Sequence, residues 1–278
     1  MSGRDERPPA PEPLAVAVTD SHCHLDLSLE GEPWPVDAAL AAAAEVGVTR
    51  IVQVGCDLPG ARWAVETAKA YDAVVAAVSL HPNEAPRLAE RGELDAALAE
   101  IEQLAAHPRV RAVGETGLDH FRTGPEGRDV QEASFRAHID LAKRLGKARV
   151  IHDRDAHDDV LRVLESEGAP EVVVFHCFSG DAAMAAHCVE RGWLLSFAGT
   201  VTFKNAQPLR DALTVAPLDA LLVETDAPYL APMPWRGRPN ASYLIPLTLR
   251  LMAEVKEVGV DELATAVAVT TERAFGRW

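Results

Sequence analysis

Eight short apolar runs alternate with segments of helical periodicity along the chain. The runs are rich in Val, Ile, Leu and Ala, and each stops at a polar residue or at a Gly or Pro. The mean distance between their ends is about 29 residues, close to the roughly 30 residues of one strand-helix unit. The pattern therefore predicts an α/β fold, a (β/α)8 TIM-type barrel. The runs end near His22, Cys56, His81, Glu115, His152, His176, Gly199 and Asp226.

The spacing of apolar residues distinguishes the strands from the helices. Runs such as 148–151 (ARVI) and 172–175 (VVVF) are continuous rather than alternating, as in parallel strands buried on both faces. A loop is expected at 228–240, which holds four prolines and follows the last strand. Helix formers with apolar residues three and four apart predict helices over 36–45, 61–71, 94–106, 131–145 and 244–258.

Length and composition limit the class of protein. The first 14 residues carry four prolines and no apolar core of a signal peptide, so we expect a disordered tail over 1–14 and a single barrel domain over 15–278. No stretch is apolar enough to span a bilayer, so no membrane association is expected. The four cysteines lack CxxC spacing, which fits reduced thiols and a cytoplasmic location. The net charge of −15 argues against a broad basic surface for long nucleic acid.

Side chains that bind divalent metals stand at the ends of the predicted strands. His22 and His24 share one face of a strand, because side chains alternate between faces. Glu115 lies between Gly114 and Gly117, which allow a ligand and the backbone to approach closely. Four imidazoles and two carboxylates from strand ends suit one or two hydrolytic metal ions. The candidate ligands are His22, His24, Glu115, His152, His176 and Asp226.

Each candidate also has a purely structural interpretation. Glu115 could be a solvated loop residue, and Asp226 could cap the N-terminus of a helix. Either His152 or His176 alone would more often be a hydrogen-bonded core histidine, but together on adjacent strands they favour a second metal site. Arg154 would share the face of His152 and bind a phosphate oxygen, or it would pair with a neighbouring aspartate at the surface.

Five blocks of the chain, in this order, resemble the TatD family of metal-dependent deoxyribonucleases. They read DSHCHLD at 20–26, GETGLD at 114–119, IHDRDA at 151–156, HCFSG at 176–180 and ETDAPYL at 224–230. The resemblance spans about residues 19–275 and implies an amidohydrolase-type barrel with a divalent metal centre. It implies further that His22, His24 and Asp226 bind a first metal, that His152 and His176 bind a second, and that Glu115 bridges the two. His81, followed by Pro82, matches a family histidine near the scissile group.

The chain departs from the family pattern in loops on the substrate side. Asn83 stands where the family often has a second histidine, and 236–242 reads RGRPNAS where Arg-Gly-x-x-Asn-Glu-Pro is usual. These changes bear on substrate preference rather than on the metal chemistry. Glu272 replaces a usual Asn at a position that looks structural.

The residues and the resemblance together predict an enzyme that hydrolyses DNA phosphodiester bonds from an end, in the manner of a 3′–5′ exonuclease. Its cofactor would be two divalent ions, with Zn, Mn, Ni, Fe and Mg all compatible. Asp226 would accept the proton of the attacking water, with Glu115 and His81 as further catalytic residues. Arg154 and Lys204 would contact the substrate. Short or single-stranded DNA ends are the expected partner, and no obligate protein partner is inferred.

Two alternatives remain open from the sequence. The same metal centre could hydrolyse an aminoacyl ester, as a D-aminoacyl-tRNA deacylase does, or another ester or amide. The chain could instead be a catalytically silent scaffold, which would not need a complete ligand set.

Overall fold

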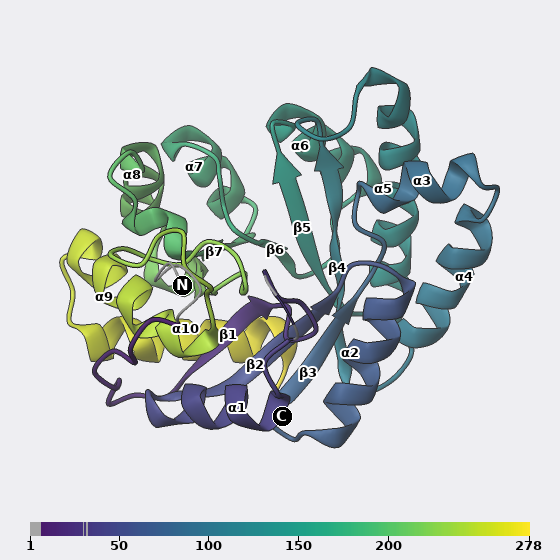
Figure 1. The fold of residues 1–278 in the computed structure, drawn as a ribbon. Coiled ribbons are helices and arrows are strands. Elements are labelled where there is room, and N and C mark those ends of the chain that lie inside the picture. Colours follow the sequence, from purple (N-terminus) through teal and green to yellow (C-terminus); the bar gives the residue numbers. More distant parts are fainter. Residues whose placement is uncertain (1–6, 30, 32) are drawn as a thin grey trace. The chain divides into compact units, whose positions relative to one another are not determined.

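The computed structural model describes residues 7–29, 31 and 33–278. Eight parallel strands follow one another in sequence order in one sheet, with helices between them (Figure 1). This arrangement confirms the predicted (β/α)8 barrel. The strands are β1 (Val18–Cys23), β2 (Val48–Gly55), β3 (Val74–Val78), β4 (Val110–Asp119), β5 (Ala148–Arg154), β6 (Val173–Phe175), β7 (Leu194–Phe197) and β8 (Leu221–Val223).

The five predicted helices are all present, and the structure adds others. The first, 36–45, has the predicted bounds, whereas the predicted 131–145 is the second part of a helix that begins at Pro125, a residue well suited to a first helical turn. The predicted loop 228–240 contains turns and no helix. The helices are α1 (Val36–Glu45), α2 (Leu58–Ala70), α3 (Glu84–Glu90), α4 (Leu94–Ala105), α5 (Pro125–Leu145), α6 (His157–Glu167), α7 (Ala182–Glu190), α8 (Gln207–Val215), α9 (Ile245–Lys256) and α10 (Val260–Phe275). None of them, within the described ranges, has the length and apolar character needed to cross a bilayer.

The chain divides into two compact units. Unit 1 comprises residues 1–53 and 180–273, and unit 2 comprises 54–179 and 274–278. The expectation of one domain over 15–278 stays a prediction.

Unit 1 holds β7, β8, β1 and most of β2. Leu195 pairs with Leu221 between β7 and β8, Val18 pairs with Val48 between β1 and β2, and a bridge joins Cys23 to Ala227. Cys23 packs with Ile51 and Ala227 in the core. The side chains of His22 and His24 therefore leave the other face of the strand, as alternation predicts.

The N-terminal segment differs from the expected tail. Residues 7–14 are held by hydrogen bonds to the rest of unit 1, because their carbonyl groups remain acceptors where prolines prevent a helix. Tyr243 Oη donates to the carbonyl of Pro8 at 2.6 Å, and Arg250 Nη2 donates to that of Glu12 at 2.7 Å. Leu14 is buried and donates its amide to the carbonyl of Val46 at 3.0 Å. Residues 1–6 of the predicted tail lie outside the described residues.

Unit 2 holds β3 to β6, with α5 packed along β4. The approach of β4 to β5 depends on two glycines. A Cβ atom at Gly114 would overlap Val150, and one at Gly117 would overlap the carbonyl oxygen of His152. The two glycines thus allow β4 and β5 to bring Glu115 and His152 together.

Candidate metal centre

In unit 2, one carboxylate meets two imidazoles. Glu115 is 4% exposed and lies within β4, which continues to Asp119. Its Oε2 atom lies 2.5 Å from Nε2 of His176 and 3.0 Å from Nδ1 of His152. The interpretation of Glu115 as a solvated loop residue is therefore wrong. The structure brings Glu115, His152 and His176 together in this unit, and their role as metal ligands stays a prediction.

Two further side chains orient Glu115. The thiol of Cys56 donates to Oε1 at 3.2 Å, and the hydroxyl of Ser79 donates to the backbone carbonyl of Glu115 at 2.5 Å. Cys56 follows β2 and Ser79 follows β3, so residues just after two preceding strands hold the side chain and the backbone of Glu115.

His152 also faces a second carboxylate, Asp119. Its Nε2 atom lies 3.4 Å from Oδ2 of Asp119. Burial lowers the pKa of His152, but hydrogen bonding to Asp119 and Glu115 outweighs it, so the net pKa is raised. For Asp119 burial acts in the opposite direction and raises the pKa. Hydrogen bonds from His152, the Arg122 amide and Asn83 outweigh burial, so the net pKa of Asp119 is lowered. The sequence prediction missed Asp119, although its place at the end of GETGLD was a usable signal.

His81 follows β3 and stacks edge-on against His152, with ring centroids 4.4 Å apart. Burial, and then the charge of His152, lowers the pKa of His81 to about 3, so its ring is neutral. Nδ1 accepts a hydrogen bond from the Asn83 amide at 3.1 Å, which leaves the proton on Nε2. Asn83, the departure from the family pattern, donates its side-chain amide to Asp119 at 3.0 Å. This residue thus organises the loop that carries His81.

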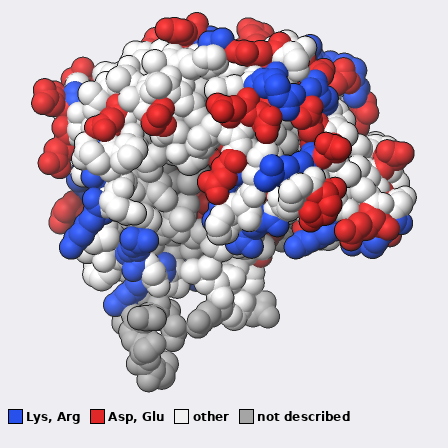
Figure 2. Space-filling view, turned by 90° about the horizontal axis from the view of Figure 1, so that it is seen from above, with Lys and Arg blue, Asp and Glu red and all other residues white. Residues whose placement is uncertain are grey.

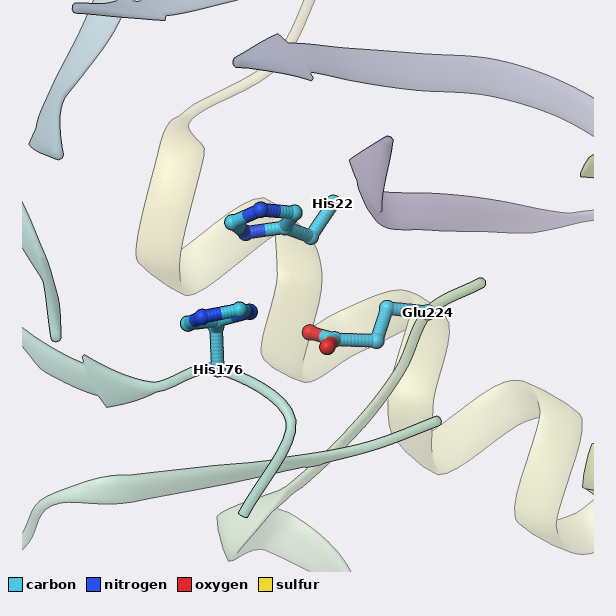
Figure 3. A group of neighbouring side chains, drawn as sticks. All are labelled: His22, His176 and Glu224. Carbon is cyan, nitrogen blue, oxygen red and sulfur yellow. The ribbon is translucent and has the colours of Figure 1, made fainter. Parts of the chain in front are cut away.

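In unit 1, a second group gathers at the ends of β1 and β8. Oδ1 of Asp226 lies 3.4 Å from Nε2 of His24 and 3.9 Å from Nε2 of His22. Figure 3 shows His22 with Glu224, a fully buried carboxylate that the sequence prediction did not assign. Potential ligand atoms of these two residues lie within 4.8 Å of each other. Glu224 stands two residues before Asp226, a spacing that could have signalled it; His176, also labelled in Figure 3, belongs to unit 2.

The backbone around Asp226 is shaped for this position. Asp226 has a φ of +55°, and its amide donates to the carbonyl of His22 at 2.9 Å. The buried Asp20 accepts hydrogen bonds from the amide and the hydroxyl of Thr225, at 2.9 and 2.5 Å. Burial raises the pKa of Asp20 to about 7. Residues 227–241 contain no helix, so the interpretation of Asp226 as a helix cap is wrong.

The predicted substrate contacts lie at the surface. Arg154 ends β5, and its guanidinium lies 4.0 Å from the ring centroid of the exposed Phe121. Its neighbour Asp153 is bound instead by His157, at 2.7 Å. Lys204 is exposed in the turn that follows β7. The roles of Arg154 and Lys204 stay predictions.

The donor set in each unit fits a divalent metal. Buried imidazole nitrogens and carboxylate oxygens converge within a few ångströms of one another in each unit, and these are the ligands that zinc, manganese, nickel and iron accept in hydrolytic sites. His152 or His176 could hold an ion with Glu115, and His22 or His24 could do so with Asp226 and Glu224. The predicted bridging role of Glu115, which would involve ligands of both units, stays a prediction.

Comparison with known proteins agrees with this chemistry. The family model described as TatD related DNase matches residues 19–276. The chain is 48% identical to the uncharacterized metal-dependent hydrolase TatD of Mycobacterium tuberculosis, over 93% of this chain and 98% of that protein. It is 39% identical to the uncharacterized metal-dependent hydrolase YabD of Bacillus subtilis, over 92% and 98%. The crystal structure of YJJV, a TatD homolog from Escherichia coli, superposes with a TM-score of 0.83 at 29% identity, covering 94% of this chain and 98% of that one. The chain therefore belongs to the TatD family of metal-dependent hydrolases.

Proposed function

We propose that this hydrolase cleaves DNA phosphodiester bonds from a free end, proceeding 3′ to 5′, with two divalent ions. The observation that carries the proposal is the contact of the buried Glu115 carboxylate with two strand-end imidazoles, His152 and His176. A buried carboxylate with two imidazoles on one oxygen is a costly arrangement unless it binds a cation. The family model, described as a DNase, supports the choice of DNA.

Each unit supplies ligands for one ion in this proposal. His22, His24 and Asp226 would hold one, and Glu115, His152 and His176 would hold the other, with Glu115 shared between them. When bound, such ions lower the pKa of water and offset negative charge on phosphate oxygens.

The side chains of the protein then have separate tasks. Asp226, whose Oδ1 lies among the imidazoles of unit 1, takes up the proton of the attacking water. The neutral ring of His81 donates a hydrogen bond from Nε2–H to a non-bridging phosphate oxygen and so orients the phosphate. Arg154 offers a planar guanidinium for a second phosphate oxygen, and Lys204 adds a positive charge on the loop after β7.

The surface charge favours DNA ends over the sides of a long duplex. Lys and Arg are interspersed with Asp and Glu on the face drawn in Figure 2, with no broad basic surface among the described residues seen there. With a net charge of −15, attraction of a polyanion has to come from a few local cations.

An assay on three substrates tests the proposal. A 5′-labelled single-stranded oligonucleotide, a D-aminoacyl-tRNA and a simple aryl ester are incubated with the protein, with chelator, and with metal restored after chelation. We expect stepwise shortening of the oligonucleotide. Chelator should abolish this shortening and added metal should restore it. A phosphorothioate bond at the 3′ end should block it. Faster release of the amino acid from tRNA would favour the deacylase alternative, and no turnover of any substrate would favour the scaffold.

A further inference from the structure

A cavity of about 480 Å³ lies beside His24 in unit 1, a size typical of small-molecule sites. One wall is the segment that follows β1, including Leu27, Leu29 and Trp34; the other is the proline-rich loop that follows β8, from Ala227 to Ser242. His24 is one of the lining residues, so a ligand in the cavity would lie next to a candidate metal ligand of this unit.

Trp34 is an aromatic residue in the cavity lining, and contacts with Arg7 and Tyr243 hold its ring in place. The guanidinium of Arg7 lies 4.2 Å from the centroid of the Trp34 ring, and both residues line the cavity. The ring of Tyr243 meets Trp34 edge-on, with centroids 6.0 Å apart. The hydroxyl of Tyr243 donates to the carbonyl of Pro8, next to Arg7. Tyr243 therefore fixes both the indole and the segment that carries the guanidinium.

The part of the lining that comes from the loop after β8 is fixed to the residues that follow that strand. The side-chain amide of Asn240 donates to the carbonyls of Thr225 and Tyr229, at 2.9 and 2.6 Å. These bonds hold Asn240, a lining residue, against the segment 225–229 that carries Asp226.

Exposed apolar side chains line the cavity, and the loop after β8 that lines it carries further cations. Leu27 and Leu29 line it and are 41% and 45% exposed, although leucines gain free energy from burial. On the loop after β8, Arg236 stacks on Phe203 at 4.4 Å and Arg238 on Trp235 at 5.4 Å. A ligand with a flat apolar ring and a negative charge would match this surface.

We infer that the cavity binds the base of the nucleotide next to the scissile phosphate, stacked on the pair formed by Trp34 and Arg7. The inference rests on the proposed function, because it assumes a nucleic-acid substrate. Aromatic rings and guanidinium planes are the surfaces on which unpaired bases stack, and such stacking accepts every base. The site should therefore favour a nucleotide with a base over an abasic one, with little preference among the four bases.

Direct binding tests the site without any turnover. Deoxyadenosine monophosphate and deoxyribose 5-phosphate are titrated calorimetrically into the wild type, Trp34→Ala and Arg7→Ala. We expect Trp34→Ala to weaken binding of the nucleotide at least about fivefold, which is the lower end of the range for losing one stacked base. Binding of the sugar phosphate should be unchanged. Arg7→Ala should weaken nucleotide binding about two- to fivefold; Arg7 is exposed, so its loss should not unfold the protein. Trp63→Ala is the matched control, a half-buried tryptophan on α2 that does not line the cavity.

Kinetics on oligonucleotides separate the site from the proposed function. The wild type should have a lower KM for a 3′ end that carries a base than for an abasic 3′ end, and Trp34→Ala should remove that difference. Nucleotide binding that depends on Trp34, without DNA hydrolysis, would support the cavity site and refute the DNase proposal. Hydrolysis of DNA with equal KM for both ends, or nucleotide binding unchanged in both variants, would overturn the inference and leave the DNase proposal intact.

Discussion

Nε2 of His176, just after β6, lies 2.5 Å from Oε2 of Glu115 in β4, and both residues are buried. His152 lies against the same oxygen, so removing the carboxylate should leave two imidazoles without their shared partner. We expect Glu115→Ala to bind less metal per chain and to lose at least about 100-fold in turnover. Loss of a residue that only supports a metal ligand costs up to about 100-fold, and loss of a ligand itself should cost at least as much. Elemental analysis of the purified variant and a metal-titrated activity curve measure both effects.

A surface glutamate provides the control for this variant. Glu66 on α2 pairs with Lys69 at the surface, so Glu66→Ala should keep full metal content and turnover. The melting temperature of Glu115→Ala should change by no more than about 4 °C, because a strand-mouth residue serves the site rather than the core. Unaltered metal content in Glu115→Ala would contradict the assignment.

Asp226→Asn tests whether the Asp226 carboxylate accepts a proton, because the variant removes the carboxylate and keeps the local backbone conformation. The φ of +55° suits Asn almost as well as Asp, so the variant should fold normally. An amide cannot take up the proton of water, and we expect turnover to fall at least about 100-fold across the pH range. Asp211→Asn, on the exposed face of α8, is the control. Near-normal kcat in Asp226→Asn would rule out its role as the base.

Gly117→Ala tests the close approach of β4 to β5. The added Cβ atom would overlap the carbonyl oxygen of His152, and the strands would have to separate. We expect a loss of about 3 kcal/mol in unfolding free energy and a melting temperature lower by about 6–12 °C, together with reduced metal binding. Gly92→Ala is the matched control, since Gly92 also has a positive φ but open space around its Cβ position. It should cost only about 1 kcal/mol. Equal destabilisation by both changes would refute the packing argument.

Glu132 on α5 should make stability depend on pH. Its hydrogen bond with Arg162, aided by Arg136, lowers its pKa from 4.5 to about 2 although partial burial opposes this. A carboxylate with a lowered folded-state pKa contributes stability above the unfolded value and loses it as the pH falls through the folded value. The contribution should be present above about pH 4.5 and lost towards pH 2. After solvent screening we expect about 1 kcal/mol.

The measurement is the difference in unfolding free energy between wild type and Glu132→Gln as a function of pH. Other carboxylates titrate in both proteins, so their effects cancel in the difference. The difference should be largest at neutral pH and vanish near pH 2. A difference that is independent of pH would show that the ion pairs of Glu132 contribute no net stability.

Substrate topology and salt test the link between acidic charge and substrate choice. We expect faster cleavage of short single-stranded DNA with free ends than of closed circular duplex. Because few phosphates are contacted at once, DNA binding should weaken only slightly as salt increases. Binding and cleavage are measured on both substrates over a range of salt concentrations. Rapid nicking of circular duplex with a steep salt dependence would show a long contact surface instead.

The sequence by itself determined the order of the elements and the identity of the candidate ligands. Hydrophobic periodicity is a local property, so the strand ending near His22 and the helix over 36–45 could be predicted from neighbouring residues alone. His22 and His24 could be placed on one face because alternation along a strand needs no knowledge of the rest of the fold. The five blocks of the family pattern added the roles.

Only the tertiary structure decided which other side chains complete these groups. Asp119 joins His152 because β4 pairs with β5, and Glu224 joins His22 because the end of β8 lies beside that of β1. The motifs signalled these two carboxylates, but they did not show which histidine each one would face. Composition suggested a disordered tail, yet Arg7 lines a cavity because Tyr243, 235 residues away from Pro8, provides a hydrogen-bond donor. Contacts between distant segments depend on packing of the whole chain, and packing is the part of the free energy that a reading of local sequence does not contain.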